Sequence, residues 1–388
     1  MADITLNPGN HPINNEASNI SGGPLLTGLG FNLFIREENS LGELFNENAI
    51  FDDFEDYIIE LLPGGLLSKT RNTISTSRVL TGGYTDNEFV GGTEVVTGSY
   101  TFPLTHEDMD LILDHALGVT QTIGENKFTN LLDIHPNRTG LGFMEVYDGL
   151  GIAGSNASPY DLGGAFYTYY SGNRISSFSF NCPSNQSFVT CTMNIIGKEE
   201  QLLGQPIAEF DLFDGTNTLN IYGTSATQEF TSKTNFPSWA TEIHLDDGSN
   251  KFRVPFYDLT ITIDNGFTTN NFIDGNYNFS GNTKNIIQTG KRNITGSFRM
   301  PYFHGLSNNS TKQFISSYLA MESFELEIVF NDEETNKVLK VICPNIKFFD
   351  GTSPKNINFS EASCNMSFKA FINPSNYAVD SELYVAYQ

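Results

Sequence analysis

Basic residues are scarce in this sequence. Its 388 residues contain 21 Lys and Arg against 45 Asp and Glu, which gives a formal net charge of −24 at pH 7. A protein that grips a nucleic-acid backbone needs Lys and Arg to displace the counterions around the phosphates. The charge balance therefore argues against strong nucleic-acid binding. It is typical of a soluble protein, and it would also suit a protein that must avoid holding DNA.

Cysteines and long apolar runs are also few. The four cysteines fit no CxxC metal pattern, so we expect reduced, buried thiols: Cys182, Cys191, Cys343 and Cys364. No run of 18 apolar residues occurs, so no transmembrane helix and no membrane partner are expected. The opening "MADITLNPGNHPINN" lacks the basic start and apolar core of a secretory signal. These features favour a cytosolic product.

The sequence also lacks the motifs that carry chemistry. Its six histidines form no HExxH pair, the glycines of residues 22–30 are not followed by the Lys-Ser/Thr of a phosphate loop, and no GxSxG elbow occurs. The prediction is therefore no catalytic residue, no metal, no cofactor and no enzymatic activity.

Aromatic and turn-forming residues are abundant. The chain has 32 Phe, 16 Tyr and 35 Gly, and only 17% of its residues are charged. This composition favours many short strands joined by turns. A chain of this length is also too long for one typical domain, so two domains of about 150–200 residues are expected.

One strand pattern occurs twice, about half the chain apart. Residues 95–103 read "VVTGSYTFP" and residues 293–301 read "NITGSFRMP". Alternate positions share a face, as in a half-buried strand, and the glycine in the middle of each indicates a bulge or a close backbone approach. We assign these residues to strand packing: Val96, Gly98, Tyr100, Phe102, Ile294, Gly296, Phe298 and Met300.

A helix and three strands are expected after each copy. The first helix has an apolar stripe of Met109, Ile112, Leu113, Ala116 and Leu117, and "STKQFISSYLAME" predicts the second. Three landmarks in the same order predict an internal duplication, with each copy a small β-sandwich packed on a helix.

The chain then divides into four parts. Residues 1–74 form an N-terminal arm with an acidic amphipathic helix in "FNENAIFDDFEDYIIELLPGG"; 75–205 are the first module, 206–250 a connection and 251–388 the second module. Residues 120–165 predict a long loop or an extended hairpin, since they are rich in Gly and Asn.

Several stretches resemble the major tail tube proteins of long-tailed bacteriophages. They are "GGTEVVTGSYTFPLTHEDMDLILDHALG" and "MNIIGKEEQ" in the first half, and "DLTITIDNGF", "TGKRNITGSFRMP" and "FELEIVFND" in the second. The likeness covers roughly residues 75–200 and 255–372. It implies a mainly β fold, here two tandem tail-tube-like β-sandwich or barrel modules, each with a flanking α-helix.

The resemblance also implies a function and partners. Such proteins close into rings, and the resemblance gives the two repeated strands a role in ring formation. The rings stack around a tape-measure protein, meet tail terminator and distal tail proteins, and later conduct DNA through a lumen without specific binding. The expected place is the virion tail, assembled in the host cytoplasm. Because rings commonly contain six folds, two modules per chain favour a trimeric, pseudo-six-fold ring, with a hexamer of whole chains as the alternative. Acidic residues in the lumen would repel the phosphates. The residues alone also permit a β-rich adhesin or a carbohydrate-binding protein.

Overall fold

The computed structural model describes a subset of the chain. It covers residues 31–38, 42, 58–59, 61–75, 89–106, 109–117, 127–129, 139–147, 166–184, 187–203, 235–248, 251–273, 282–288, 292–301, 316, 319–332, 336–351, 363–372 and 383–387. Within these residues, 17 strands belong to one antiparallel hydrogen-bonded network, and β13 and β14 form a separate hairpin. The mainly β fold expected from the sequence is confirmed.

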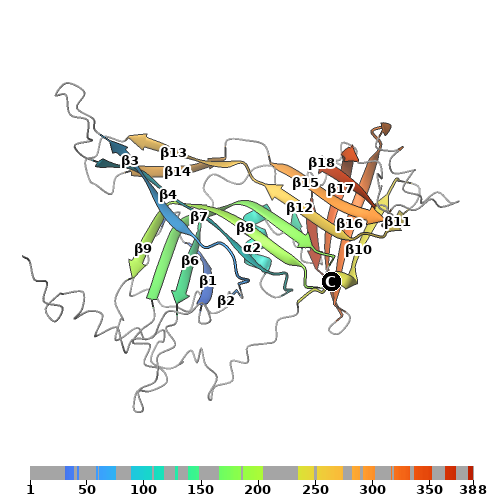
Figure 1. Cartoon of the computed structure of the whole chain (residues 1–388), viewed down its shortest axis with the longest axis horizontal. Helices are drawn as coiled ribbons and strands as arrows, with labels where there is room; N and C mark the ends of the chain where they lie inside the picture. The colour runs from blue at the N-terminus through green and yellow to red at the C-terminus, as the bar shows by residue number, and fades with distance from the viewer. Residues whose placement is uncertain are drawn as a thin grey trace, which may run out of the picture.

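The first half consists of the described elements before residue 204. It lies mainly on the left in Figure 1. Its elements are β1 (Phe31–Glu37), β2 (Ile58–Ile59), β3 (Ser68–Ser75), β4 (Phe89–Pro103), α2 (Met109–Leu117), β5 (Lys127–Thr129), β6 (Leu141–Tyr147), β7 (Phe166–Cys182), β8 (Thr190–Gly197) and β9 (Glu199–Leu203).

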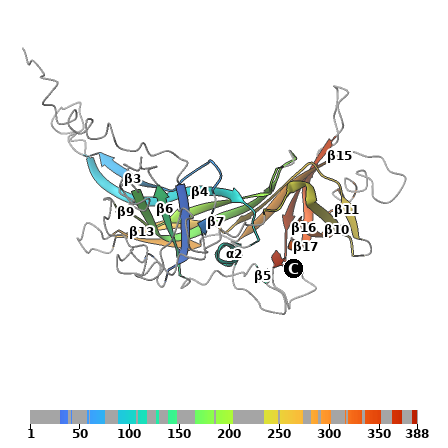
Figure 2. The ribbon, with the colours of Figure 1, turned by 90° about the horizontal axis from the view of Figure 1, so that it is seen from below.

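Most of the second half lies on the right in Figures 1 and 2, whereas its β13–β14 hairpin extends to the left, over the first half. Its elements are a 3-10 turn (Ser238–Ala240), β10 (Thr241–Asp246), β11 (Lys251–Val254), β12 (Asp258–Asp264), β13 (Phe267–Ile273), β14 (Asn282–Gln288), β15 (Asn293–Pro301), β16 (Ser323–Asp332), β17 (Lys337–Gly351), β18 (Ser363–Ala370) and β19 (Tyr384–Tyr387).

Seven strand pairings recur in the two halves in the same chain order. In the first half the strands run β3–β4–β8–β7–β6–β1–β2, with β9 also paired to β7. In the second half they run β12–β15–β18–β17–β16–β10–β11, with β19 also paired to β17. Each half therefore contains strands with the same neighbours on both sides.

The register also agrees between the halves. Tyr100 lies opposite Met193, and Phe298 lies opposite Met366. One pair further along, Phe102 faces Cys191 and Met300 faces Cys364. The same irregularity recurs as well: β7 is bulged between Ile175 and Ser177 against β8, and β17 between Phe348 and Asp350 against β18. Bulges at the same place point to the same local twist.

The core lies against one face of each sheet. Strands with alternating apolar residues bury every second side chain, as the burial pattern of β12 and β18 shows. Aromatic rings fill the space between the layers; for example, Phe298, Phe348 and Phe368 contact one another at centroid distances of 6.0–6.5 Å. Edge-on and tilted contacts of this kind add to the hydrophobic gain of burial.

The expected apolar stripe of the helix α2 is confirmed. The second half donates hydrogen bonds to the C-terminal end of this helix. Met109, Ile112, Leu113, Ala116 and Leu117 are all buried. Asn265 donates from Nδ2 to the Ala116 carbonyl (3.1 Å), and Arg292 donates from Nη1 to the Leu117 carbonyl (2.7 Å). These donors satisfy carbonyls that a helix end leaves without partners.

The second expected helix is described at its end only. The Ala320 N–H donates to the Ser316 carbonyl (2.9 Å), which is an α-helical contact. Its last residues are open to solvent: Leu319 is 74% exposed and Met321 is 62% exposed. The C-terminal end of α2 is therefore covered by the second half, whereas the C-terminal end of the second helix is exposed.

Three expected segments differ in the structure. The acidic helix does not extend over Ile58–Ile59, which pair as β2 with Phe34 and Leu33, because a tertiary strand partner outweighs the helical periodicity. The remainder of that helix lies outside the described residues. β10 pairs with β16, so strands of the second half begin inside the expected 206–250 connection. β5 and β6 lie within residues 120–165, the expected long loop or extended hairpin; β5 pairs with β19, and β6 pairs with β1 and β7.

Candidate functional site

Eight strands form a continuous sheet that runs through both halves. Their order is β3–β4–β8–β7–β12–β15–β18–β17, and all neighbours are antiparallel. Within this sheet the two halves join where residues 177–182 of β7 pair with β12: Ser177 lies opposite Asp264 and Cys182 opposite Leu259. Outside this sheet, β5 of the first half also pairs with β19 of the second. The Asn265 N–H extends this junction by donating to the Ser176 carbonyl (2.9 Å).

The face of this sheet that points away from the core carries short polar side chains. Hydroxyl and amide groups neighbour one another across strands: Thr101 and Thr192 share a hydrogen bond of 3.2 Å, and Asn194 Nδ2 donates to Ser177 Oγ (2.8 Å). The face includes Thr97, Ser99, Thr101, Ser177, Ser179, Asn181, Thr192, Asn194, Thr260, Thr262, Thr295, Ser297, Asn365 and Ser367. We call this the hydroxyl face.

Charges on the hydroxyl face are few and balanced. The exposed or half-buried ones are three acidic and three basic residues: Asp258, Asp264, Asp350, Arg299, Lys347 and Lys369. Arg299 and Asp258 form an ion pair of 2.9 Å. The chain as a whole has a net charge of −24, so its acidic excess lies elsewhere.

The eight residues assigned from the repeat lie in the middle of this sheet. Val96, Tyr100 and Phe102 on β4 are buried on the core face, and so, on β15, are Ile294, Phe298 and Met300. They pack the two halves and do not line an open surface. Their proposed role in ring formation would act through the strands that they hold in place.

Gly98 and Gly296 mark close approaches, as the pattern suggests. A Cβ atom on Gly98 would lie 2.3 Å from the Leu66 carbonyl oxygen and 2.8 Å from Leu67 Cα. A Cβ atom on Gly296 would lie 2.3 Å from Phe368 Cζ and 2.8 Å from the Thr260 carbonyl oxygen. Both distances to backbone are shorter than real Cβ contacts allow, so a side chain at either position would force neighbouring atoms to shift.

The first half holds its two layers together with buried polar groups. The Tyr100 hydroxyl donates to Glu145 Oε1 (2.7 Å), the Leu67 N–H donates to the same oxygen (3.3 Å), and the Tyr170 hydroxyl donates to the Leu67 carbonyl (2.9 Å). A buried carboxylate needs such donors to offset the loss of its hydration. The corresponding place in the second half is apolar, with Phe298 in the register position of Tyr100.

The continuous sheet ends in two strands with one open side each. Among the described residues, β3 pairs only with β4, and residues 348–351 of β17 pair only with β18. Leu62 and Leu66 are exposed just before β3, and Phe349 is exposed on β17. An unpaired strand edge is a template for another chain.

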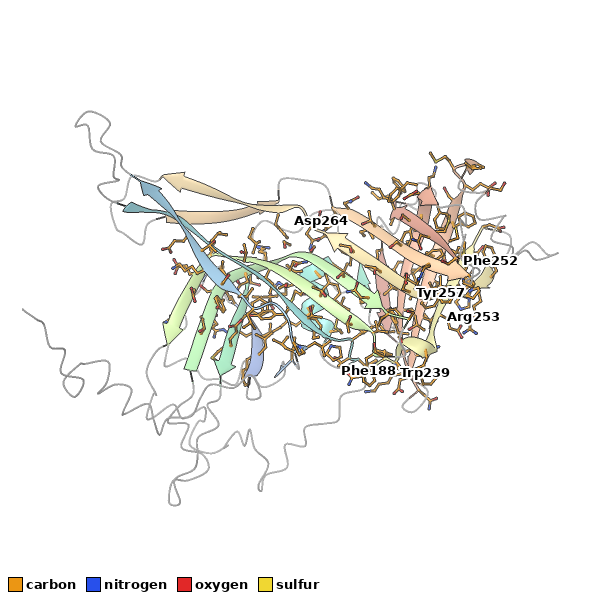
Figure 3. All side chains as sticks on the ribbon, viewed as in Figure 1. Phe188, Trp239, Phe252, Arg253, Tyr257 and Asp264 are labelled. Carbon is orange, nitrogen blue, oxygen red and sulfur yellow. The ribbon has the colours of Figure 1, made fainter. Side chains whose placement is uncertain are left out.

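A separate cleft of about 390 Å³ lies beside the junction of the halves. Its lining includes Pro183, Trp239, Arg253 and Tyr257. Trp239 is 63% exposed, and nearby Phe188, whose backbone bridges to Pro237, is 51% exposed (Figure 3). The cleft therefore combines exposed aromatic surface with the polar side chains of Arg253 and Tyr257.

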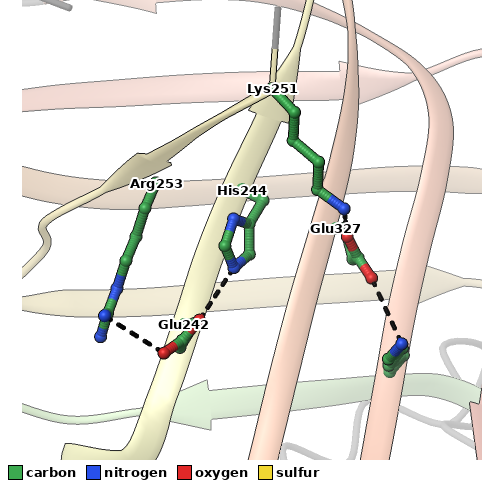
Figure 4. A network of polar contacts seen from close by, with 6 residues as sticks. Glu242, His244, Lys251, Arg253 and Glu327 are labelled. Atoms are coloured by element: carbon green, nitrogen blue, oxygen red, sulfur yellow. Dashed lines mark hydrogen bonds and ion pairs between the residues drawn. The ribbon is translucent and has the colours of Figure 1, made fainter.

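Charged residues gather on the outer face of the second half (Figure 4). Glu242 contacts His244 Nε2 (2.9 Å) and Arg253 Nη1 (3.2 Å), and Glu327 contacts Lys251 and, at 3.7 Å, Lys340. Ion pairs at a wet surface contribute little to stability, so this cluster keeps the outer face soluble.

Chemistry-bearing clusters are missing from the part of the chain that the structure describes. No group of three or more His, Cys, Asp or Glu side chains there could hold a metal ion. The four cysteines are free and buried, as expected. Burial raises the pKa of the Cys182 thiol to about 11 and raises that of Cys191 and Cys364, which keeps these thiols protonated. Among the described residues, no helix is long and apolar enough to cross a membrane.

A mainly β subunit with a through-running sheet and an open strand at either end is suited to pairing with further chains. The profile of the family described as phage tail tube protein matches residues 32–360. The chain belongs to this family, and it is a structural tail tube protein of the virion tail.

Solved structures resemble parts of the chain. The tube terminator of an extracellular contractile injection system has 14% identity over 36% of this chain and 95% of that chain, with a TM-score of 0.29. The tail of a GTA particle has 9% identity over 34% and 90%, with a TM-score of 0.26; the SPP1 tail tube has 9% over 34% and 72%, with a TM-score of 0.23. No curated protein matches the chain significantly. The family assignment rests on the profile match.

The sequence located the central strands of the site but missed its junction and edges. The pairing of β7 with β12 joins residues about 80 positions apart and carries no local pattern. The repeated cysteine and methionine pairs, Cys191 with Met193 and Cys364 with Met366, are a signal that could have aligned the last strands of the two halves.

Proposed function

We propose that this chain forms the tail tube of a long-tailed bacteriophage by closing into rings of three copies, and that each copy supplies two tandem modules to a pseudo-six-fold barrel. The observation that carries the proposal is the recurrence of seven strand pairings in the same order in the two halves. If the halves are equivalent, three chains present six sheet units. Rings then stack head to tail, since such contacts do not close on themselves.

The eight-stranded sheet would form one third of the barrel wall. Its core face packs under the outer strands and α2, so its hydroxyl face is the one available to the lumen. Short hydroxyl and amide groups with balanced charge neither attract nor repel a phosphate backbone strongly. A lumen lined by the hydroxyl face would differ from the acidic lumen expected from composition. Such a lining would bind DNA only weakly.

The proposed modules differ slightly from the expected boundaries. The first would include β1, β2 and β3, since these pair within the first-half order, and the second would begin with β10. The role is structural, without catalysis. Ring stacking would enclose a tape-measure protein, and the tube ends would meet terminator and distal tail proteins. The particle would assemble in the host cytoplasm.

Ring symmetry tests the proposal. The purified chain is concentrated until it assembles and is imaged by electron microscopy, while native mass spectrometry counts the chains in a ring. Hollow striated tubes with three chains per ring are expected. Six chains per ring would favour the hexamer of whole chains, and a discrete particle without tubes would overturn the proposal.

A further inference from the structure

We infer that β17 of one chain pairs antiparallel with β3 of the next chain, with Asp350 opposite Thr70 and Gly351 opposite Lys69. This contact would repeat, between chains, the junction that β7 and β12 make within one chain. The inference rests on the proposed ring and names its interface. The occupant of each open edge is thus a second copy of the same chain.

The first half of the register follows from β4 and β15, whose Thr-Gly-Ser sequences align. Ile263 lies opposite Ile294 just as Lys69 lies opposite Val96. Asp264 lies opposite Asn293 just as Thr70 lies opposite Val95. On β3, Lys69 and Thr70 therefore occupy the positions that Ile263 and Asp264 occupy on β12.

The other half follows from β8 and β18. Ser177 lies opposite Asn194, and Asp350 lies opposite Ser367, each directly after the shared bulge. Phe178 lies opposite Met193, and Gly351 lies opposite Met366. Asp350 and Gly351 therefore occupy on β17 the positions of Ser177 and Phe178 on β7.

The junction inside the chain supplies the pairing. There, Asp264 lies opposite Ser177, and Ile263 lies opposite Phe178. Exchanging each residue for its counterpart places Thr70 opposite Asp350 and Lys69 opposite Gly351. Thr70 and Asp350 are both exposed, so their side chains leave this pair of positions open to a neighbouring strand; the Thr70 hydroxyl donates to the Val95 carbonyl (3.3 Å) within its own chain.

The helices support the same interface independently of the strands. Within the chain, the second half bonds the last carbonyls of α2 through Asn265 and Arg292, and the end of α2 is buried. At the end of the second helix, Leu319 and Met321 are exposed. The first half of the next chain would cover this end, as the second half covers α2.

The positions of the open edges of β3 and β17 also suit head-to-tail pairing of chains. β3 is in the first half and β17 in the second, at opposite ends of the strand order (Figure 1). One edge of each chain meets the other edge of its neighbour, which is a heterologous contact that closes into a ring when the rotation permits.

Cysteine cross-linking tests the register. Paired residues on adjacent antiparallel strands have the Cα separation that a disulfide needs. Chains that carry both Thr70→Cys and Asp350→Cys are assembled, oxidised and run under denaturing, non-reducing conditions. We expect a covalent ladder that ends at the trimer. The native thiols are buried and protonated, so they should not compete.

Matched controls separate the interface from chance contact. The double variant Ser68→Cys with Lys347→Cys is out of register by about four residue pairs, since residue 349 is bulged, or about 13 Å along the strand, and should give no ladder. Each single variant alone should give no covalent dimer, whereas a mixture of Thr70→Cys chains and Asp350→Cys chains should give dimers and nothing larger. The mixture also serves if the double variant assembles poorly.

The outcomes distinguish this inference from the proposed function. Tubes that form without cross-links in the matched pair and in the mixture would overturn the register and leave the tube function standing. Dimers from either single variant alone would show a symmetric contact and overturn the head-to-tail interface. Failure of the unaltered chain to form rings or tubes would instead overturn the proposed function.

Discussion

Tyr100 on β4 donates its hydroxyl hydrogen to the carboxylate of Glu145 on β6 across 2.7 Å, inside the core of the first half. Tyr100→Phe removes this donor and leaves a buried carboxylate with one fewer hydrogen bond. We expect a loss of about 1–3 kcal/mol in the free energy of unfolding. Denaturant unfolding of the unassembled chain measures it.

Tyr170→Phe is the matched comparison, because its hydroxyl donates to the neutral carbonyl of Leu67. Its loss should be smaller, about 1 kcal/mol, since hydrogen bonds to neutral acceptors contribute less than those to charged ones. Equal losses from the two variants would contradict the role assigned to the buried charge.

Local patterns account for what the sequence predicted. The Thr-Gly-Ser strands follow a period of two and α2 follows a period of 3.6, so β4, β15 and the buried stripe from Met109 to Leu117 could be inferred. The pairing of Ile58–Ile59 with Leu33 and Phe34 could not, because only a distant strand makes it favourable. Likewise, the balanced charge of the hydroxyl face depends on register, which composition does not contain.

The two repeat glycines should differ in their tolerance of a side chain. Gly98→Ala would push Cβ into the backbone of Leu66 and Leu67, whereas Gly296→Ala would first meet the far end of the Phe368 ring. We expect a loss of about 3 kcal/mol or more for Gly98→Ala, and of about 1–2 kcal/mol for Gly296→Ala. Thermal unfolding compares them, with the exposed Ser297→Ala as a control that should change little. A tolerated Gly98→Ala would show that the close approach is absent.

Glu325 should make stability depend on pH. Glu325 is exposed at the surface but partly desolvated by its neighbours; this desolvation, and then the negative charges of Asp246 and Glu327, raise its pKa above the ordinary 4.5, although Lys251 opposes this. A raised pKa in the folded state means that ionised Glu325 opposes folding, so its contribution is most favourable below pH 4.5 and is lost as pH rises through the folded-state pKa.

The corresponding test is Glu325→Gln, followed by melting temperature against pH. The variant should be more stable than the unaltered chain near neutral pH, and its advantage should shrink as the pH falls toward 4.5. Glu322→Gln, an exposed carboxylate on the same segment, is the control. A constant advantage at every pH would rule out the ionisation as its cause.

Leu319 and Met321 should matter for assembly more than for folding. Both are exposed in the single chain, so Leu319→Gln with Met321→Gln should leave its melting temperature nearly unchanged. If the next chain covers them, the lost apolar burial, about 1.5–3 kcal/mol for each fully buried side chain, should raise the concentration needed for ring formation more than tenfold. Sedimentation at a series of protein concentrations measures the concentration at which rings form. Phe188→Gln, which alters an exposed aromatic outside the proposed interface, should assemble normally.

Lysine substitutions on the hydroxyl face should impede the passage of DNA. Thr260 and Thr262 lie on this face, two residues apart on β12, and neither is fully exposed nor buried. Thr260→Lys with Thr262→Lys would add two cations to each chain, and these would repeat around the proposed lumen. Because each cation that neutralises a phosphate releases counterions, assembled variant tubes should retain short duplex DNA at low salt and release it as salt rises. The unaltered tubes should retain little at any salt, and Thr260→Gln with Thr262→Gln, which adds length without charge, should behave like them. Equal retention by the lysine and glutamine variants would mean that this face does not line the channel, since cations on the channel wall would attract the phosphate backbone of DNA inside it.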